Sequence, residues 1–229
     1  MALSWKTTAF EDIKGTTLRI RHVSSDHART ASAEAPLGTL LWPAGHLLAR
    51  FLARCAPDAV RERTVLELGS GTGLAGLTAA ALGARHVLLT DAGSESVVLD
   101  NLRWNEEENR KRAVLTAPVT VMPLTWASFS ASVLAMPPVD VVLAADCLYR
   151  SADYEDLMAT LAFLLDERPD AVCYAVVQER NADREGELDR QAAAFGLHAA
   201  IHPSSATVAD WFPDAEVHSL RLYTLSAAR

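Results

Sequence analysis

Hydrophobic residues along the chain form short apolar runs that alternate with stretches of helical spacing. Such runs predict strands, because strands buried on both faces are almost continuously apolar. They lie at residues 65–68, 86–90, 119–122, 139–145, 171–177, 197–201 and 216–224. Apolar positions three and four residues apart predict helices at residues 43–52, 74–82, 94–109, 153–165 and 182–195. This alternation indicates an α/β fold whose parallel sheet is covered by helices on both faces.

The first 40 residues follow a different pattern. Residues 16–23 alternate between apolar and polar positions, which predicts a half-buried strand, and the Ser, Ala and charged residues at 24–36 predict a loop. We therefore expect an N-terminal extension over residues 1–40 and a core over residues 41–229. A length of 229 residues fits a single domain with one core.

Composition narrows the class of protein. Half of the residues are hydrophobic and 22% are charged, the balance of a soluble globular chain. The formal net charge of −8 argues against nucleic-acid binding, which needs a basic surface, and suits a basic protein partner. No apolar run approaches the ~20 residues of a membrane helix, and the N-terminus lacks the apolar core of a secretory signal.

The cysteines and histidines show no pattern of a disulfide framework or a metal site. The three cysteines are an odd number without paired spacing, which indicates a reducing compartment, the cytoplasm or the nucleus. No cluster of His, Cys and Asp has metal-ligand spacing, so no metal is expected. A monomer is the expected state.

A glycine loop joins the first strand of the core to the helix that follows it. It reads Glu67-Leu68-Gly69-Ser70-Gly71-Thr72-Gly73. Glycines allow a tight turn and close approach to a ligand, and the N–H groups at the start of the helix favour polar or anionic ligand groups. Asp91 ends the next strand, where an acidic side chain can accept both hydroxyls of a ribose. The pair therefore predicts a nucleoside-containing cofactor.

The identity of that cofactor stays open between two classes. Gly71, Gly73 and Gly76 satisfy the G-x-G-x-x-G spacing of a dinucleotide site, so a nicotinamide-dependent dehydrogenase is one interpretation. The acidic Glu67 beside the loop would repel a pyrophosphate but not a cofactor that carries a sulfonium and an amino group. S-adenosylmethionine is therefore the favoured cofactor. A third interpretation is that the glycines only form a tight turn.

Five segments resemble a known family, the family-16 protein lysine methyltransferases. The glycine loop looks like motif I of the seven-β-strand methyltransferases, to which this family belongs. The segments 38–44, with Trp42, and 101–105, with Asn101 and Asn105, are similar to its Gly-x-x-x-Trp-x-Ala and Asn-x-x-x-Asn stretches. Residues 124–126 resemble its Leu-Asp-Trp element, with Thr in place of the usual Asp, and residues 146–149 match its Asp-x-x-Tyr motif.

The resemblance implies a fold and a set of cofactor contacts. The fold is Rossmann-like, with seven mostly parallel strands, helices on both faces and an antiparallel last strand. Asp91 would bind the ribose, Trp126 would lie beside the adenine, and Trp42 would close over the cofactor. The other implied cofactor contacts are Glu67, Gly69, Ser70, Gly71 and the backbone of Ala145.

The resemblance also implies the residues that meet the acceptor. Asp146 and Tyr149 would sit at the mouth of the site, where Asp146 orients an amine and Tyr149 offers its ring to the developing positive charge. An ordinary carboxylate is too weak to act as a committed general base. The alternative interpretations are a helix N-cap for Asp146, packing for Tyr149, and a place in the core for Trp42 and Trp126.

These observations predict an S-adenosylmethionine-dependent protein lysine methyltransferase. A chaperone or a translation elongation factor is the expected kind of substrate, since the family includes enzymes that act on both. The alternatives are a small-molecule amine or a protein histidine as the acceptor, or a cofactor-binding scaffold without transfer activity. Substrate choice is expected to lie in residues 1–40 and in the loop at 204–214.

Overall fold

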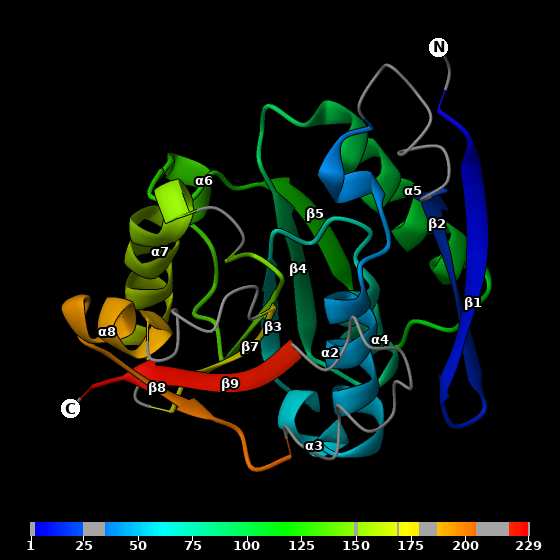
Figure 1. Ribbon diagram of the computed structural model, residues 1–229. Helices are drawn as coiled ribbons and strands as arrows, with labels where there is room; N and C mark the ends of the chain where they lie inside the picture. Colours follow the sequence, from blue (N-terminus) through cyan, green and yellow to red (C-terminus); the bar gives the residue numbers. More distant parts are fainter. Residues whose placement is uncertain are drawn as a thin grey trace.

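A seven-stranded sheet forms the centre of the computed structural model, which describes residues 3–24, 35–148, 151–168, 170–178, 187–204 and 220–228 (Figure 1). The strands lie in the order β5-β4-β3-β6-β7-β9-β8. Their bounds are β3 Thr64–Leu68, β4 His86–Asp91, β5 Val119–Pro123, β6 Val141–Ala145, β7 Val172–Gln178, β8 Leu197–Ile201 and β9 Leu220–Ala227. All neighbouring strands from β5 to β7 pair in parallel, whereas β9 is antiparallel to both β7 and β8. The predicted fold class is therefore confirmed.

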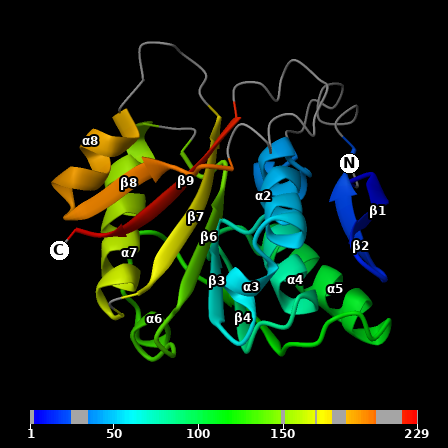
Figure 2. The same ribbon diagram turned by 90° about the horizontal axis from the view of Figure 1, so that it is seen from below.

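Helices cover both faces of this sheet (Figure 2). One face carries α2 Pro43–Arg54, α4 Leu74–Ala81 and α5 Ser96–Lys111, and the other carries α7 Tyr154–Asp166 and α8 Glu187–Ala194. Two four-residue helices, α3 Pro57–Val60 and α6 Ala131–Leu134, were not predicted because one turn is too short to show a helical period. The 3-10 turns are η1 Leu37–Thr39 and η2 Ser151–Asp153. Residues 182–186 and 216–219, predicted as helix and strand, lie outside the described residues.

The core divides into two apolar layers, one on each face of the sheet. Successive side chains of a strand point to opposite faces, so Val65 enters the layer beneath α2, α4 and α5, while Leu66 and Leu68 enter the layer beneath α7 and α8. All three side chains are completely buried. This two-sided burial explains why β3 is apolar at successive positions, interrupted by Glu67, rather than alternating between apolar and polar residues.

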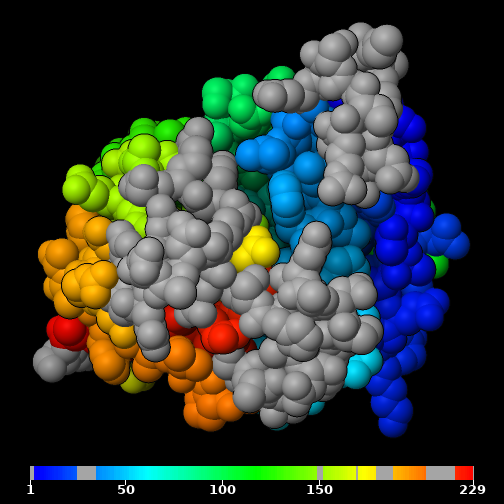
Figure 3. All heavy atoms as spheres, viewed as in Figure 1, coloured from blue at the N-terminus to red at the C-terminus, as the bar shows by residue number. Residues whose placement is uncertain are grey.

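The N-terminal segment forms a two-stranded antiparallel hairpin, β1 Trp5–Ile13 and β2 Thr16–Val23, which lies against α2 and α5. Figure 3 shows the side of the hairpin that lies next to α2. Only the second strand was predicted, because most positions of β1 are polar and at least partly exposed and so show no apolar run. Phe10, Leu18 and Ile20 are nevertheless buried in the same layer as α2. The hairpin turns at Gly15, whose φ of +74° lies in the region that favours glycine.

The described residues contain neither a membrane-spanning helix nor a metal-binding cluster. No helix there is long and apolar enough to cross a membrane. Likewise, no group of three or more His, Cys, Asp and Glu side chains within the described ranges has an arrangement that could hold a metal ion.

Candidate functional site

A cavity of about 560 Å³ opens at the carboxyl ends of β3, β4 and β6. The chain passes from β3 to one side of the sheet and then returns to the other side through β6, so this is the switch point at which open α/β sheets bind ligands. The volume lies within the ~300–1,000 Å³ range of small-molecule sites. The residues that line the cavity belong to the segments 37–45, 67–74, 91–98 and 124–126, together with Ala145, Asp146, Cys147, Asp153 and Asp156.

The glycine loop presents backbone, without side chains, to this cavity. Gly69 and Gly71 have φ values of +55° and +54°, which strongly favour glycine. A Cβ on Gly69 would lie 3.0 Å from the Cys147 sulfur and 3.4 Å from the ring of Trp126, and one on Gly71 would lie 3.1 Å from the Gly38 carbonyl oxygen. Any side chain at these two positions would therefore crowd the neighbouring protein atoms.

Glu67 lines the cavity and also caps the helix that follows the loop. Its Oε2 accepts a hydrogen bond from the Gly76 N–H at 3.0 Å, in the first turn of α4. A Cβ on Gly76 would lie 2.7 Å from this oxygen and 2.3 Å from Leu89 Cδ2, so the third glycine of the G-x-G-x-x-G spacing is required by packing. The side chain is 3% exposed, and burial raises the pKa of Glu67 to about 8.

Asp91 at the end of β4 and Ser70 within the loop hold the loop in place. Asp91 accepts hydrogen bonds from the N–H of Gly71 at 2.9 Å and of Ala92 at 2.8 Å, and burial raises the pKa of its carboxyl. The Ser70 hydroxyl donates to the Glu67 carbonyl at 3.0 Å and accepts from the Thr90 N–H at 2.9 Å. Both residues line the cavity, and Ser70 also ties the loop to the end of the neighbouring strand.

Two tryptophans border the cavity from different segments. Trp42 precedes α2 and is 37% exposed, and its indole N–H donates to the Leu37 carbonyl at 3.0 Å. This exposure contradicts the interpretation of Trp42 as a core residue. Trp126 is half-buried, and its ring packs beside Gly69. The structure thus brings both predicted aromatic residues to the site.

Asp146 follows β6 in a left-handed conformation with φ of +53°. Its N–H donates to the Val176 carbonyl at 2.8 Å, and the residue lines the cavity together with Ala145. The alternative interpretation as the helix N-cap is wrong, because Asp153 occupies that position of α7. Tyr149, its predicted partner, lies outside the described residues.

Cys147 is a structural residue of this site. Its thiol donates to the Leu68 carbonyl at 3.2 Å, and burial raises the pKa of the Cys147 thiol well above its usual range. A buried thiol with a raised pKa is a poor nucleophile, which argues against covalent catalysis through Cys147.

Sequence reasoning missed part of the acidic lining. Of the described residues that line the cavity, six are carboxylic acids and none is Lys, Arg or His: Glu67, Asp91, Glu95, Asp146, Asp153 and Asp156. Asp153 and Asp156 lie three residues apart at the start of α7, a spacing that places two side chains on one side of a helix. The raised pKa keeps Glu67 mostly protonated at neutral pH, which weakens its expected repulsion of a pyrophosphate. The other carboxylates still give the lining a negative potential, which favours cationic ligands.

Comparison with known proteins assigns the chain to a family. The family model described as lysine methyltransferase matches residues 28–188, well over half of the chain. The histone-arginine methyltransferase METTL23 of Xenopus laevis is 34% identical over 146 residues, which cover 64% of this chain and 59% of the relative. The protein N-terminal and lysine N-methyltransferase efm7 of Emericella nidulans is 27% identical over 175 residues, which cover 72% and 63%. The chain thus spans less than two thirds of the length of several relatives that it matches.

Solved structures show the same fold at low sequence identity. The TehB-like SAM-dependent methyltransferase from Corynebacterium glutamicum matches with a TM-score of 0.54 and 18% identity, covering 79% of this chain and 87% of that one. SMU.776 in complex with SAH matches with a TM-score of 0.60 and 14% identity, and the match covers 96% of this chain and 55% of that one.

These matches decide between the two cofactor classes left open by the glycine spacing. The cofactor prediction is confirmed at the level of the family, which uses S-adenosylmethionine rather than a dinucleotide. The chain belongs to the lysine methyltransferase family, and its fold is that of the S-adenosylmethionine-dependent methyltransferases.

Proposed function

We propose that this protein transfers a methyl group from S-adenosylmethionine to the side-chain nitrogen of a lysine in a protein substrate. The observation that carries the proposal is the cavity beside the open glycine loop, whose described lining holds six carboxylic acids and no basic side chain. Both the donor, which carries a sulfonium, and the acceptor, which is a basic group, suit such a negative potential.

The residues at the loop fit the cofactor. Gly69 and Gly71 line the cavity without side chains, and the methionine portion of the cofactor would lie against them. Asp91 lines the same cavity and would accept the ribose hydroxyls, and the ring of Trp126 would lie beside the adenine. The remaining residues proposed to hold the cofactor are Trp42, Glu67, Ser70 and Ala145.

Catalysis here is mainly alignment. The cofactor supplies a methyl group on a positively charged sulfur, a good leaving group that needs no acid. An ammonium has no lone pair, so the acceptor lysine loses its proton to water before the transfer. Asp146 then accepts a hydrogen bond from the neutral amine and holds its lone pair in line with the methyl group. The carboxylates of Asp146, Asp153 and Asp156 stabilise the positive charge that develops on the nitrogen.

Arginine is the second candidate acceptor. The observation that favours it is the identity of 32–34% with METTL23 proteins of four vertebrates, which are named histone-arginine methyltransferases. The calmodulin-lysine N-methyltransferase of Arabidopsis thaliana is 35% identical over 125 residues and favours lysine. A chaperone or elongation factor as the substrate, a cytoplasmic or nuclear location and a monomeric state stay predictions.

Two measurements test the function. Isothermal titration of the protein with S-adenosylhomocysteine and with NAD tests the site, and we expect only the first to bind. Incubation with tritiated S-adenosylmethionine and lysate of cells that lack the protein tests the reaction, followed by mass spectrometry of the labelled protein band. Methyl-lysine supports the proposal and methyl-arginine supports the second candidate. Label confined to small molecules, or cofactor binding without any transfer, contradicts both.

The variant Asp146→Ala separates binding from transfer. We expect it to bind S-adenosylhomocysteine like the wild type but to transfer methyl about a hundredfold more slowly, because a positioned hydrogen bond to the acceptor is lost. Asp58→Ala, which changes an exposed aspartate in α3, is the matched control and should keep full activity. Undiminished transfer by the Asp146 variant would remove this residue from the mechanism.

A further inference from the structure

Three asparagines of α5 form a ladder against the hairpin. Asn101, Asn105 and Asn109 are spaced four residues apart and are completely buried. The Arg19 N–H donates to Asn109 Oδ1 at 2.8 Å, and the Arg21 N–H donates to Asn105 Oδ1 at 2.7 Å. In return, the side-chain amides of Asn109 and Asn105 donate to the carbonyls of the same two residues at 2.8 and 3.1 Å.

Through these side chains, α5 offers β2 the hydrogen-bond donors and acceptors that a neighbouring strand would offer. A carboxamide offers one acceptor and one donor group, as a peptide does. Four residues of helix rise about 6 Å and two residues of strand rise about 6.8 Å, so the spacing of the asparagines matches that of Arg19 and Arg21. The backbone N–H and carbonyl groups of Arg19 and Arg21 are satisfied in this way.

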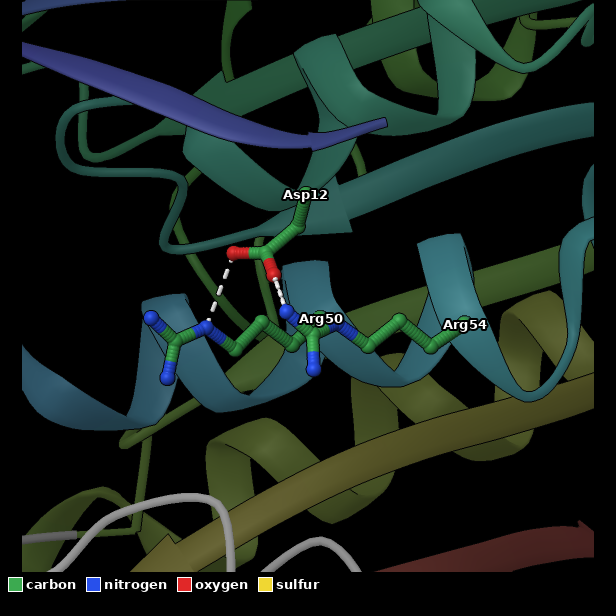
Figure 4. A network of polar contacts seen from close by, with 3 residues as sticks. All are labelled: Asp12, Arg50 and Arg54. Carbon is green, nitrogen blue, oxygen red and sulfur yellow. Dashed lines mark hydrogen bonds and ion pairs between the residues drawn. The ribbon is translucent and has the colours of Figure 1, made fainter. Parts of the chain in front are cut away.

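Further contacts fasten the hairpin to both helices. The Asp12 carboxylate of β1 accepts hydrogen bonds from Arg50 Nε at 2.8 Å and from Arg54, both on α2 (Figure 4). The Arg21 guanidinium lies between the rings of Trp5 and Trp104, with centroid distances of 4.6 and 4.4 Å. The hairpin is thus held to α2 by ion pairs, and to α5 by stacking and by hydrogen bonds of the asparagine side chains.

Asn105 alone in this ladder also reaches the glycine loop. Its amide donates to the Thr72 carbonyl at 2.9 Å. The N–H of the same peptide unit, that of Gly73, donates to the Ser70 carbonyl on the opposite side at 2.7 Å. Because a peptide unit is planar, these two bonds together fix its orientation, and a peptide flip would break both.

We propose that Asn105 is a positioning residue for the cofactor. By joining the Arg21 backbone to the Thr72 carbonyl, it sets the conformation of the glycine loop and makes the N-terminal hairpin part of the cofactor site. This inference rests on the proposed cofactor site. It assigns a purpose to the Asn101–Asn105 segment, which the proposed reaction leaves unexplained.

Asn105→Ala and Asn109→Ala form a closely matched pair of variants. Each removes three side-chain hydrogen bonds, two of which go to one residue of β2. The third bond of Asn105 goes to the glycine loop, whereas that of Asn109 goes to the carbonyl of Asn105 within α5. Similar losses of thermal stability are therefore expected, with only the first variant altering the loop.

The readouts are the affinity for S-adenosylhomocysteine by calorimetry, measured well below the melting temperature, and hydrogen exchange of residues 69–74. Asn105→Ala should raise the dissociation constant about tenfold and speed exchange in the loop, since an unsatisfied carbonyl frees the peptide. Asn109→Ala should leave the dissociation constant within about twofold and loop exchange unchanged. Equal effects of the two variants on both readouts would overturn the proposal.

A second variant keeps the test decisive if Asn105→Ala does not fold. N105D keeps the size of the side chain and an acceptor for the Arg21 N–H but lacks the donor for the Thr72 carbonyl. It should weaken S-adenosylhomocysteine binding more than Asn109→Ala does, and equal binding would refute the role. A wild type that binds no S-adenosylhomocysteine would instead refute the cofactor site itself, so the two failures are distinguishable.

Discussion

Replacing Asp91 with alanine is expected to raise the dissociation constant for S-adenosylhomocysteine about a thousandfold, because the proposed role of Asp91 is to accept two hydrogen bonds from the ribose hydroxyls. The same change removes the acceptor for the Gly71 N–H, so the loop loses a support as well. Isothermal titration calorimetry measures the effect directly.

Two further variants test whether the loss of affinity is specific to the Asp91 carboxylate. Asp100→Ala removes an exposed aspartate of α5 that pairs only with Arg103 among the described contacts, and it should bind like the wild type. Asp91→Asn keeps the shape but not the charge, and its affinity should fall between those of the wild type and the alanine variant. Binding by Asp91→Ala within threefold of the wild type would show that the ribose is held elsewhere.

Glu67→Gln is expected to change how stability depends on pH. The pKa of Glu67 is about 8 in the folded protein, against an ordinary value of 4.5. The folded state therefore holds a proton that the unfolded state has released between these values, and stability falls as pH rises from about 4.5 to 8. The free energy of unfolding of the wild type is therefore lower by up to ~5 kcal/mol at alkaline pH than at acid pH.

Urea unfolding of the cofactor-free proteins at pH 5, 7 and 9 measures the Glu67 effect. Glutamine keeps a side-chain oxygen for the Gly76 N–H but does not ionise, so the variant should match the wild type at pH 5 and exceed its free energy of unfolding at pH 9. Glu155→Gln, at an exposed position of α7, should follow the wild-type curve throughout. Parallel curves for wild type and Glu67→Gln would contradict the raised pKa.

The fold was predictable from the sequence where burial leaves a local pattern. Each strand of the sheet carries its own apolar run, so the positions of β3, β4 and β6 were predicted to within two residues. Strand β1 was missed because only Phe10 and Ile13 of its nine residues are buried. The contact of β2 with α5 was also beyond prediction, since it depends on asparagine side chains some 80 to 90 residues away in sequence.

The site was predictable where strand ends place residues directly. Asp91 ends one of three neighbouring parallel strands, and Gly69 and Asp146 follow the other two, so their convergence follows from topology alone. The helix-capping bond of Glu67 was not predictable, because it depends on how closely α4 packs on the sheet. Asp153 and Asp156 were not predicted to line the cavity for a similar reason, since the path of the chain after β6 decides whether α7 reaches it.

The position of β9 between β7 and β8 imposes an order on folding. Strand β8 precedes β9 in the chain, yet its only strand partner among the described residues is β9. During synthesis β8 therefore emerges before its partner exists and must wait, with its backbone unpaired, until β9 has inserted against β7. The step that completes the sheet is thus expected to be the last, and a ribosome stalled just before β9 would leave both β7 and β8 without the strand that pairs with them.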